Sequence, residues 1–137
     1  MIIDATDLIL GRMAAFAAKQ ALLGNEVNII NCERTIITGN KEFLIKRYTQ
    51  RIHRGEPHHG PNYPRRPDLL IRRTIRGMLP YKQFKGEIAF KRIKCFVGLP
   101  EGLKEKPISI ERAHKKKLKN MKFVTLLEIC KHIGYKG

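Results

Sequence analysis

The segment RRTIRGMLPYK, at residues 72–82, places basic side chains between apolar ones. Arg72 and Arg76 are four residues apart, as are Ile71 and Ile75, so a helix would separate an arginine face from an isoleucine face. A guanidinium group is planar and permanently charged, and it forms paired hydrogen bonds with phosphate. The spacing therefore predicts a helix that packs its isoleucines into a core and presents its arginines to an anion.

Similar side chains continue on both sides of this segment. Histidines lie among them, and Tyr48, Tyr63 and Tyr81 could stack on unpaired nucleotides. A run such as Lys115–Lys117 is more often a solvated surface when it stands alone, but here it adds to many arginines. The candidate binding residues are Arg47, Arg51, Arg54, His58, His59, Arg65, Arg66, Arg72, Arg73, Arg76, Lys82, Lys85, Arg92, Lys115, Lys116 and Lys117.

The net charge of +16 points to a polyanionic partner. Residues 1–40 carry three basic and four acidic side chains, residues 41–94 carry fifteen and four, and residues 95–137 carry ten and four. Nucleic acid is the first partner to consider, and an anionic membrane surface is the second. The chain has no RRM, KH or zinc-finger signature, so we expect it to bind RNA by shape and backbone.

Metal binding and catalysis are less favoured functions for the histidines, cysteines and aspartates. His53, His58, His59 and the three cysteines match no compact zinc motif, and we expect no metal or other cofactor. Asp4 and Asp7 could be catalytic, but an aspartate beside a first strand is more simply a cap or a turn former. We therefore expect no enzyme.

A nucleotide site is the sharpest enzyme alternative. The loop LILGRMAA leads into a helix, and the amide groups at a helix N-terminus attract phosphate. Gly11 alone, however, makes neither a dinucleotide fingerprint nor a P-loop. Two further alternatives stay open: a DNA-binding regulator, and a membrane-surface protein using the basic helix at 41–54, whose apolar stripe is better used in a core.

The length, composition and cysteine content of the chain favour one folded domain in a reducing compartment. The chain has 137 residues, 42% of them hydrophobic, and no stretch apolar enough to span a membrane. The start MIIDATDLIL has acids where a signal peptide needs a positive region, so we expect no secretion. Three scattered cysteines without a CxxC pair indicate free thiols.

Strands and helices alternate along the chain. The sequence predicts strands at residues 1–4, 27–30, 34–38 and 93–97. It predicts helices at residues 13–23, 41–54, 67–79 and 126–133, with a short helix before the fourth strand. This alternation is typical of an α/β fold around a mainly parallel sheet.

We expect a single domain over residues 1–137, with an α/β core at 1–103. A basic insert at about 53–67 contains GEPHHGPNYPRRP, whose four prolines rule out regular structure. A loop this long in a compact domain is usually functional. Residues 104–137 are expected to form a basic tail that ends in a helix and becomes ordered only on RNA.

RTIRGMLPYK, followed at a short distance by AFKRIKCFVGLPEG, resembles the signature region of the universal large-subunit ribosomal protein family thirteen. The residues of these motifs resemble those of the archaeal and eukaryotic branch of the family. IIDATDLILGRMAAFAAKQALLG is similar to the family's first strand, LGR turn and alanine-rich helix, and NIINCERTIITGNK is similar to its next two strands. The resemblance covers roughly residues 1–103.

The resemblance implies a three-layer α/β/α fold with a four-stranded, mainly parallel sheet in the order 3-2-1-4. It implies a structural constituent of the large ribosomal subunit, in the cytoplasm, that binds large-subunit rRNA and supports assembly. Neighbouring ribosomal proteins would be partners, with no small-molecule substrate and no membrane. The residues it places against rRNA are Arg12 of the LGR turn and Arg72, Arg73, Arg76 and Lys82 of the signature, with Gly77 and Pro80 shaping that segment.

Overall fold

A parallel sheet of three strands forms the centre of the protein, for which a computed structural model describes residues 1–137. The strands β1 (Ile2–Asp4), β2 (Val27–Ile30) and β4 (Ile93–Cys95) lie in the order β1-β2-β4. The register pairs Ile3 with Ile29, and both side chains are fully buried. Paired residues point to the same face of a sheet, so this face is the one that packs into the core.

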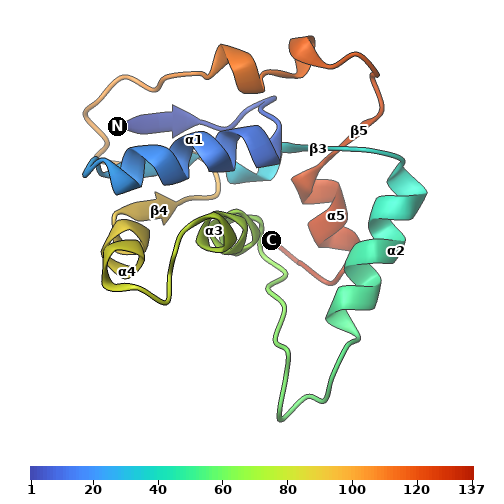
Figure 1. The fold of residues 1–137 in the computed structure, drawn as a ribbon. Helices are drawn as coiled ribbons and strands as arrows, with labels where there is room; N and C mark the ends of the chain where they lie inside the picture. The colour runs from blue at the N-terminus through green and yellow to red at the C-terminus, as the bar shows by residue number, and fades with distance from the viewer.

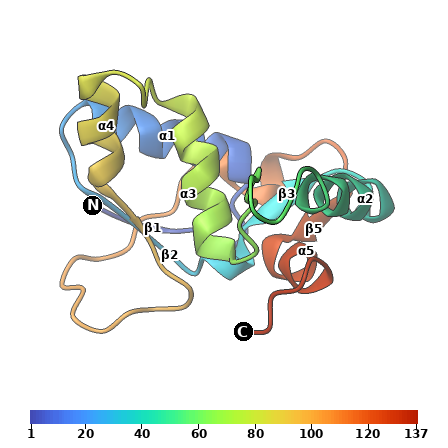
Figure 2. The same ribbon diagram turned by 90° about the horizontal axis from the view of Figure 1, so that it is seen from below.

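Three helices cover that face: α1 (Leu10–Leu22), α3 (Pro67–Met78) and α4 (Phe84–Lys91) (Figure 2). Small side chains of α1, including Ala14 and Ala17, are fully buried and let the helix lie close to α3. The isoleucine face of α3 is buried, as its spacing predicted.

A second, smaller unit lies beside the sheet (Figure 1). Strand β3 (Ile36–Thr38) pairs antiparallel with β5 (Phe123–Thr125). Helices α2 (Lys41–Ile52) and α5 (Leu126–His132) pack against each other there. The segment between α2 and α3 contains no helix or strand, which confirms the expected irregular loop.

The expected four-stranded sheet in the order 3-2-1-4 is wrong. After β2 the chain enters a left-handed turn at Asn31, whose φ is 55°, and a short 3₁₀ segment at Cys32–Arg34. This turn carries β3 away from the sheet, and the far side of β2 is taken by β4. At the other edge, Ile108 forms an isolated parallel bridge with Ile3.

The expected second layer of helices is also wrong. Helices α2 and α5 pack beside the parallel sheet (Figure 2), and no helix packs on its second face, although Ile2 and Ile30 on that face are buried. On that face, Asn28 is half-buried and Lys94 is exposed. A polar side chain in the middle of a strand is tolerated where one face of the sheet meets water.

The C-terminal segment is part of the core. Leu126, Ile129 and Cys130 are fully buried in the same apolar cluster as the sheet and α1. The structure shows the terminal helix, and a buried apolar face on α5 together with the β3–β5 pairing joins it to the core. That the tail becomes ordered only on RNA stays a prediction.

Candidate nucleic-acid interface

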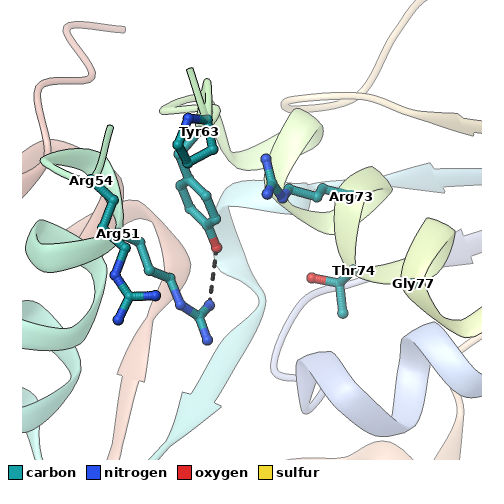
Figure 3. A pocket seen from close by; sticks show the side chains of 7 residues that line it. Arg51, Arg54, Tyr63, Arg73, Thr74 and Gly77 are labelled. Carbon is teal, nitrogen blue, oxygen red and sulfur yellow. Dashed lines mark hydrogen bonds between the residues drawn. The ribbon is translucent and has the colours of Figure 1, made fainter. Parts of the chain in front are cut away.

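Two helices and the loop between them enclose a basic cleft, here called the α2–α3 cleft. It has a volume of about 340 Å³. Figure 3 shows Arg51 and Arg54 on one side, Arg73 and Thr74 on the other, and Tyr63 between them. The lining residues are Arg51, Arg54, Pro61, Tyr63, Arg73, Thr74 and Gly77.

The position of each arginine follows from how its helix packs. Asn40 caps α2 by accepting a hydrogen bond from the Glu42 amide at 3.1 Å. Leu44 and Tyr48 are buried, so Arg51 and the following turn lie at the edge of the helix that faces α3. Pro67 begins α3 with its φ already near the helical value.

Arg73 is placed by the same logic on α3. Ile71 and Ile75 are fully buried, and Arg73, two residues from each of them, is turned partly outward. The Arg73 Nη1 donates a hydrogen bond to the Asn62 carbonyl at 3.1 Å. This bond ties the guanidinium to the loop that closes the cleft.

Tyr63 holds two of the arginines in place. The Arg51 Nη1 donates a hydrogen bond to the Tyr63 hydroxyl at 3.2 Å. The Arg73 guanidinium carbon lies 4.5 Å from the centre of the Tyr63 ring, within cation–π range. Tyr63 in turn meets Tyr48 edge to face, with ring centres 6.2 Å apart. An aromatic ring orders a guanidinium without neutralising it.

The cleft keeps its positive charge. None of Arg51, Arg54 and Arg73 forms an ion pair with a carboxylate. Burial and the neighbouring Tyr63 raise the pKa of Tyr48, and the nearby Arg51 only partly opposes this shift. Tyr48 is therefore neutral around pH 7, and the arginines are the only charged groups lining the cleft.

The other arginines of α3 pack on aromatic rings outside the cleft. The Arg72 guanidinium lies 4.3 Å from the Phe90 ring centre, and its Nε is buried without a hydrogen-bond partner. The exposed Arg76 lies 5.2 Å from the Tyr81 ring centre. Lys82 and Lys85, in the α3–α4 connection and the first turn of α4, are exposed.

A separate basic group forms where the tail crosses the start of α1. The Arg12 Nη1 donates a hydrogen bond to the Arg112 carbonyl at 3.0 Å. Arg12, Arg112 and Lys117 line a shallow groove together with Phe16. Lys116 and Lys117 are exposed, whereas Lys115 pairs with Asp7 at 3.2 Å.

Several predicted residues lie apart from these groups. Arg92 donates to the Ala21 carbonyl at 2.9 Å and so closes the end of α1. Arg66 pairs with Asp68 at 3.0 Å, and Arg65 lies beside Gly134. The remaining three are exposed: Arg47 on α2, and His58 and His59 in the loop, where His59 lies 3.9 Å from Glu56.

Some lining residues were missed by the sequence reasoning. Thr74 and Gly77 belong to the cleft, and their signal was their position one and four residues after Arg73 on the same helix. Arg112 was missed because nothing in its local pattern shows that the tail crosses α1.

The structure also locates the residues of the alternative sites. No group of three or more histidine, cysteine, aspartate or glutamate side chains is arranged to hold a metal ion. Gly11 lies in the first turn of α1, against which the tail packs around Ala113. No helix has both the length and the apolar character needed to cross a membrane.

Known proteins resemble the chain over nearly its whole length. The family described as "Ribosomal protein L13" matches residues 1–102. A protein of Methanocaldococcus jannaschii named "Large ribosomal subunit protein uL13" is 45% identical, over 98% of this chain and 98% of its own. Relatives of the same name from Methanopyrus kandleri and Archaeoglobus fulgidus are 44% and 39% identical, over 98% and 99% of this chain and 86% and 88% of their own.

These relatives are archaeal, in agreement with the branch that the sequence resembled, and they extend the likeness beyond residue 102 into the C-terminal segment. The chain belongs to the ribosomal protein L13 family.

Proposed function

We propose that this protein is a structural constituent of the large ribosomal subunit that binds large-subunit rRNA and supports subunit assembly. Its relatives carry the name of a large-subunit protein over almost the whole chain. It would act in the ribosome, in the cytoplasm, with rRNA and neighbouring ribosomal proteins as its partners and without catalysis.

The observation that carries the rRNA-binding part is the α2–α3 cleft. Three arginines line it without a single carboxylate, and an aromatic ring holds two of them in fixed positions. Arginines held in this way lose little side-chain entropy when they form hydrogen bonds with phosphate. The cleft is therefore preorganised for the RNA backbone.

The mechanism is an electrostatic clamp on a rigid mount. The parallel sheet and its helices form the mount, and the cleft forms the clamp. Each phosphate that is bound releases condensed counterions, so affinity should fall steeply as salt rises. The groove at Arg12 and Lys117, and the exposed Arg76, Lys82 and Lys85, would add contacts around the clamp.

The remaining predicted residues take smaller parts in this proposal. Exposed side chains that are free to reach phosphate supplement the clamp, namely Arg47, Arg65, His58, His59 and Lys116. Residues already engaged within the protein contribute mainly through the local field, namely Arg66, Arg72, Arg92 and Lys115.

A sucrose gradient of a native extract tests the ribosomal role. We expect the protein to migrate with the large subunit at low salt and after a moderate rise in salt. A peak at the top of the gradient at low salt would contradict the proposal, and binding of DNA and of nucleotides would then be measured instead.

A triple variant tests the cleft. Replacing Arg51, Arg54 and Arg73 by alanine should weaken binding to large-subunit rRNA and reduce the slope of log affinity against log salt by about 2 to 3. A matched variant that replaces the exposed lysines Lys19, Lys131 and Lys136 removes the same charge outside the cleft. If both variants lost the same affinity, net charge and not the cleft would account for binding.

A further inference from the structure

The connection between α3 and α4 exposes large apolar side chains beside basic ones. Phe84, the first residue of α4, is 78% exposed, the highest value among the large hydrophobic residues of the chain. Met78 and Tyr81 are 44% and 43% exposed. We name these three side chains the α3–α4 platform. A single exposed apolar residue is ordinary, but three within seven residues of one short connection offer a partner more apolar area than scattered residues do.

The backbone that carries the platform is fixed. A Cβ atom at Gly86 would collide with the Pro80 carbonyl oxygen, so the first turn of α4 packs directly on the connection. The Gln83 amide donates to the same carbonyl at 2.9 Å, and the Tyr81 amide donates to Leu79 at 2.8 Å. Phe84 is thus held out in water by a rigid turn, which keeps the entropy cost of binding low.

The charge around the platform selects the kind of partner. Lys82 and Lys85 flank Phe84 in sequence and are exposed, and Arg76 lies against the Tyr81 ring. A hydrophobic surface of another protein would form no favourable electrostatic contact with these three cationic side chains. Unpaired nucleotides combine a flat apolar base with a negative phosphate, and aromatic rings beside basic residues bind them by stacking.

The platform also adjoins the α2–α3 cleft. Gly77 lines the cleft, and the next residue, Met78, belongs to the platform. A strand whose phosphates occupy the cleft can therefore continue along α3 to the connection. We propose that the α3–α4 platform stacks unpaired nucleotides of the RNA held in the cleft, with Phe84 as the main stacking surface, an inference that rests on the proposed rRNA binding.

The chain contains no tryptophan, which makes the test direct. A Phe84→Trp variant places the only indole of the protein on the platform, and a stacked base quenches indole fluorescence. We would titrate it with folded large-subunit rRNA transcript and with a fully paired RNA duplex at equal nucleotide concentration, while fluorescence anisotropy of labelled RNA reports binding. The matched control is Met121→Trp, because Met121 is 67% exposed on the tail segment before β5.

The expected result is quenching of the indole at position 84 by folded rRNA, with little quenching by the duplex and none at position 121. Bound rRNA without quenching at position 84 would overturn the stacking proposal while leaving the clamp intact. Equal quenching at both positions, or an indole shielded only in the assembled subunit, would also overturn it, the second in favour of a protein neighbour. Absence of rRNA binding by the wild-type protein would instead refute the proposed function.

Alanine substitution supplies an independent measure. Phe84→Ala should lower affinity for folded rRNA roughly 10-fold, within the range of base–aromatic stacking, and leave the salt slope unchanged. Phe84→Tyr keeps the ring and should restore affinity, whereas Phe84→Leu keeps only the apolar area and should not. Equal affinity of the leucine and wild-type proteins would contradict a stacking role.

Discussion

Helices α1 and α3 pack against each other on the same sheet, yet they use their outer surfaces differently. The outer surface of α1 carries two basic residues, Arg12 and Lys19, whereas α3 carries three arginines within five residues. Both helices bury small or branched apolar side chains toward the sheet. The packing face and the binding face of a helix can therefore vary independently.

The two regions also order their arginines by different means. Arg12 and Arg92 donate to backbone carbonyls and serve local structure. The three arginines of α3 lie on aromatic rings, and only Arg73 also donates to a backbone carbonyl, that of Asn62, which leaves most of their N–H groups available for an anion. Loss of Arg92 should thus act mainly on stability, whereas changes in the cleft should act on RNA binding.

The largest expected effect tests the stability half of this contrast. Ile29→Ala removes a fully buried side chain from the central strand β2 and should lower the free energy of unfolding by about 2–5 kcal/mol. Urea denaturation followed by circular dichroism measures the change. A decrease in the free energy of unfolding below about 1 kcal/mol would show that the stability of the fold does not depend on the packing of this sheet.

The next effect tests the ring that organises the cleft. Tyr63→Ala keeps every arginine but frees Arg51 and Arg73, which should lower rRNA affinity about tenfold through the cost of ordering them. The salt slope should stay the same because no charge is removed. Tyr63→Phe keeps the ring and should cost less; a variant with a shallower salt slope would mean that phosphate contacts themselves were lost.

A third comparison separates neighbouring arginines of α3. Arg72 lies on Phe90 with a buried Nε, so Arg72→Ala should destabilise the fold by about 1 kcal/mol and lower the thermal midpoint by about 4 °C. Arg73→Ala should lower the midpoint less, because its guanidinium has no buried unpaired nitrogen and lies at the open cleft, and it should weaken RNA binding. Calorimetry and RNA titration of both variants measure this, and equal midpoints would remove the distinction.

A further effect concerns alkaline pH. Burial and the nearby Asp68 charge raise the pKa of Cys130 to about 12, and a hydrogen bond with Cys95 together with burial raises the pKa of Cys32. Unfolded thiols lose their protons near pH 9 while the folded ones keep them, so stability should decline above pH 9.

Denaturant midpoints between pH 8 and pH 10 measure this decline. Cys130→Ala should make the pH dependence shallower, even though it lowers stability at every pH. A pH dependence that stays as steep in this variant would assign the decline to other groups.

Much of the local structure was predictable from short patterns. Alanines at 14–21 predicted α1, Pro67 with Asp68 predicted the start of α3, and the isoleucine spacing predicted its buried face. The arginines lining the cleft were all among the candidates. These features depend on residues within one or two helical turns of each other, so the periodicity of the sequence predicts them directly.

The partner of β3 was not predictable in the same way. Its residues read as a strand, and they form one, but pairing with β5 some ninety positions later depends on where the chain turns at Asn31. The sheet order and the absence of a second helical layer follow from that turn. The same long-range contacts bring the C-terminal segment into the core.

The sequence by itself determined the element types, the basic character of the middle of the chain and the family, because each depends on local composition and residue spacing. Only the tertiary structure decided which arginines act together. Tyr63 joins Arg51 of one helix to Arg73 of another, while Arg72, next to Arg73 in the chain, packs on Phe90 instead. Adjacent residues on a helix point about 100° apart, so the surrounding elements, and not sequence proximity, select the partner of each.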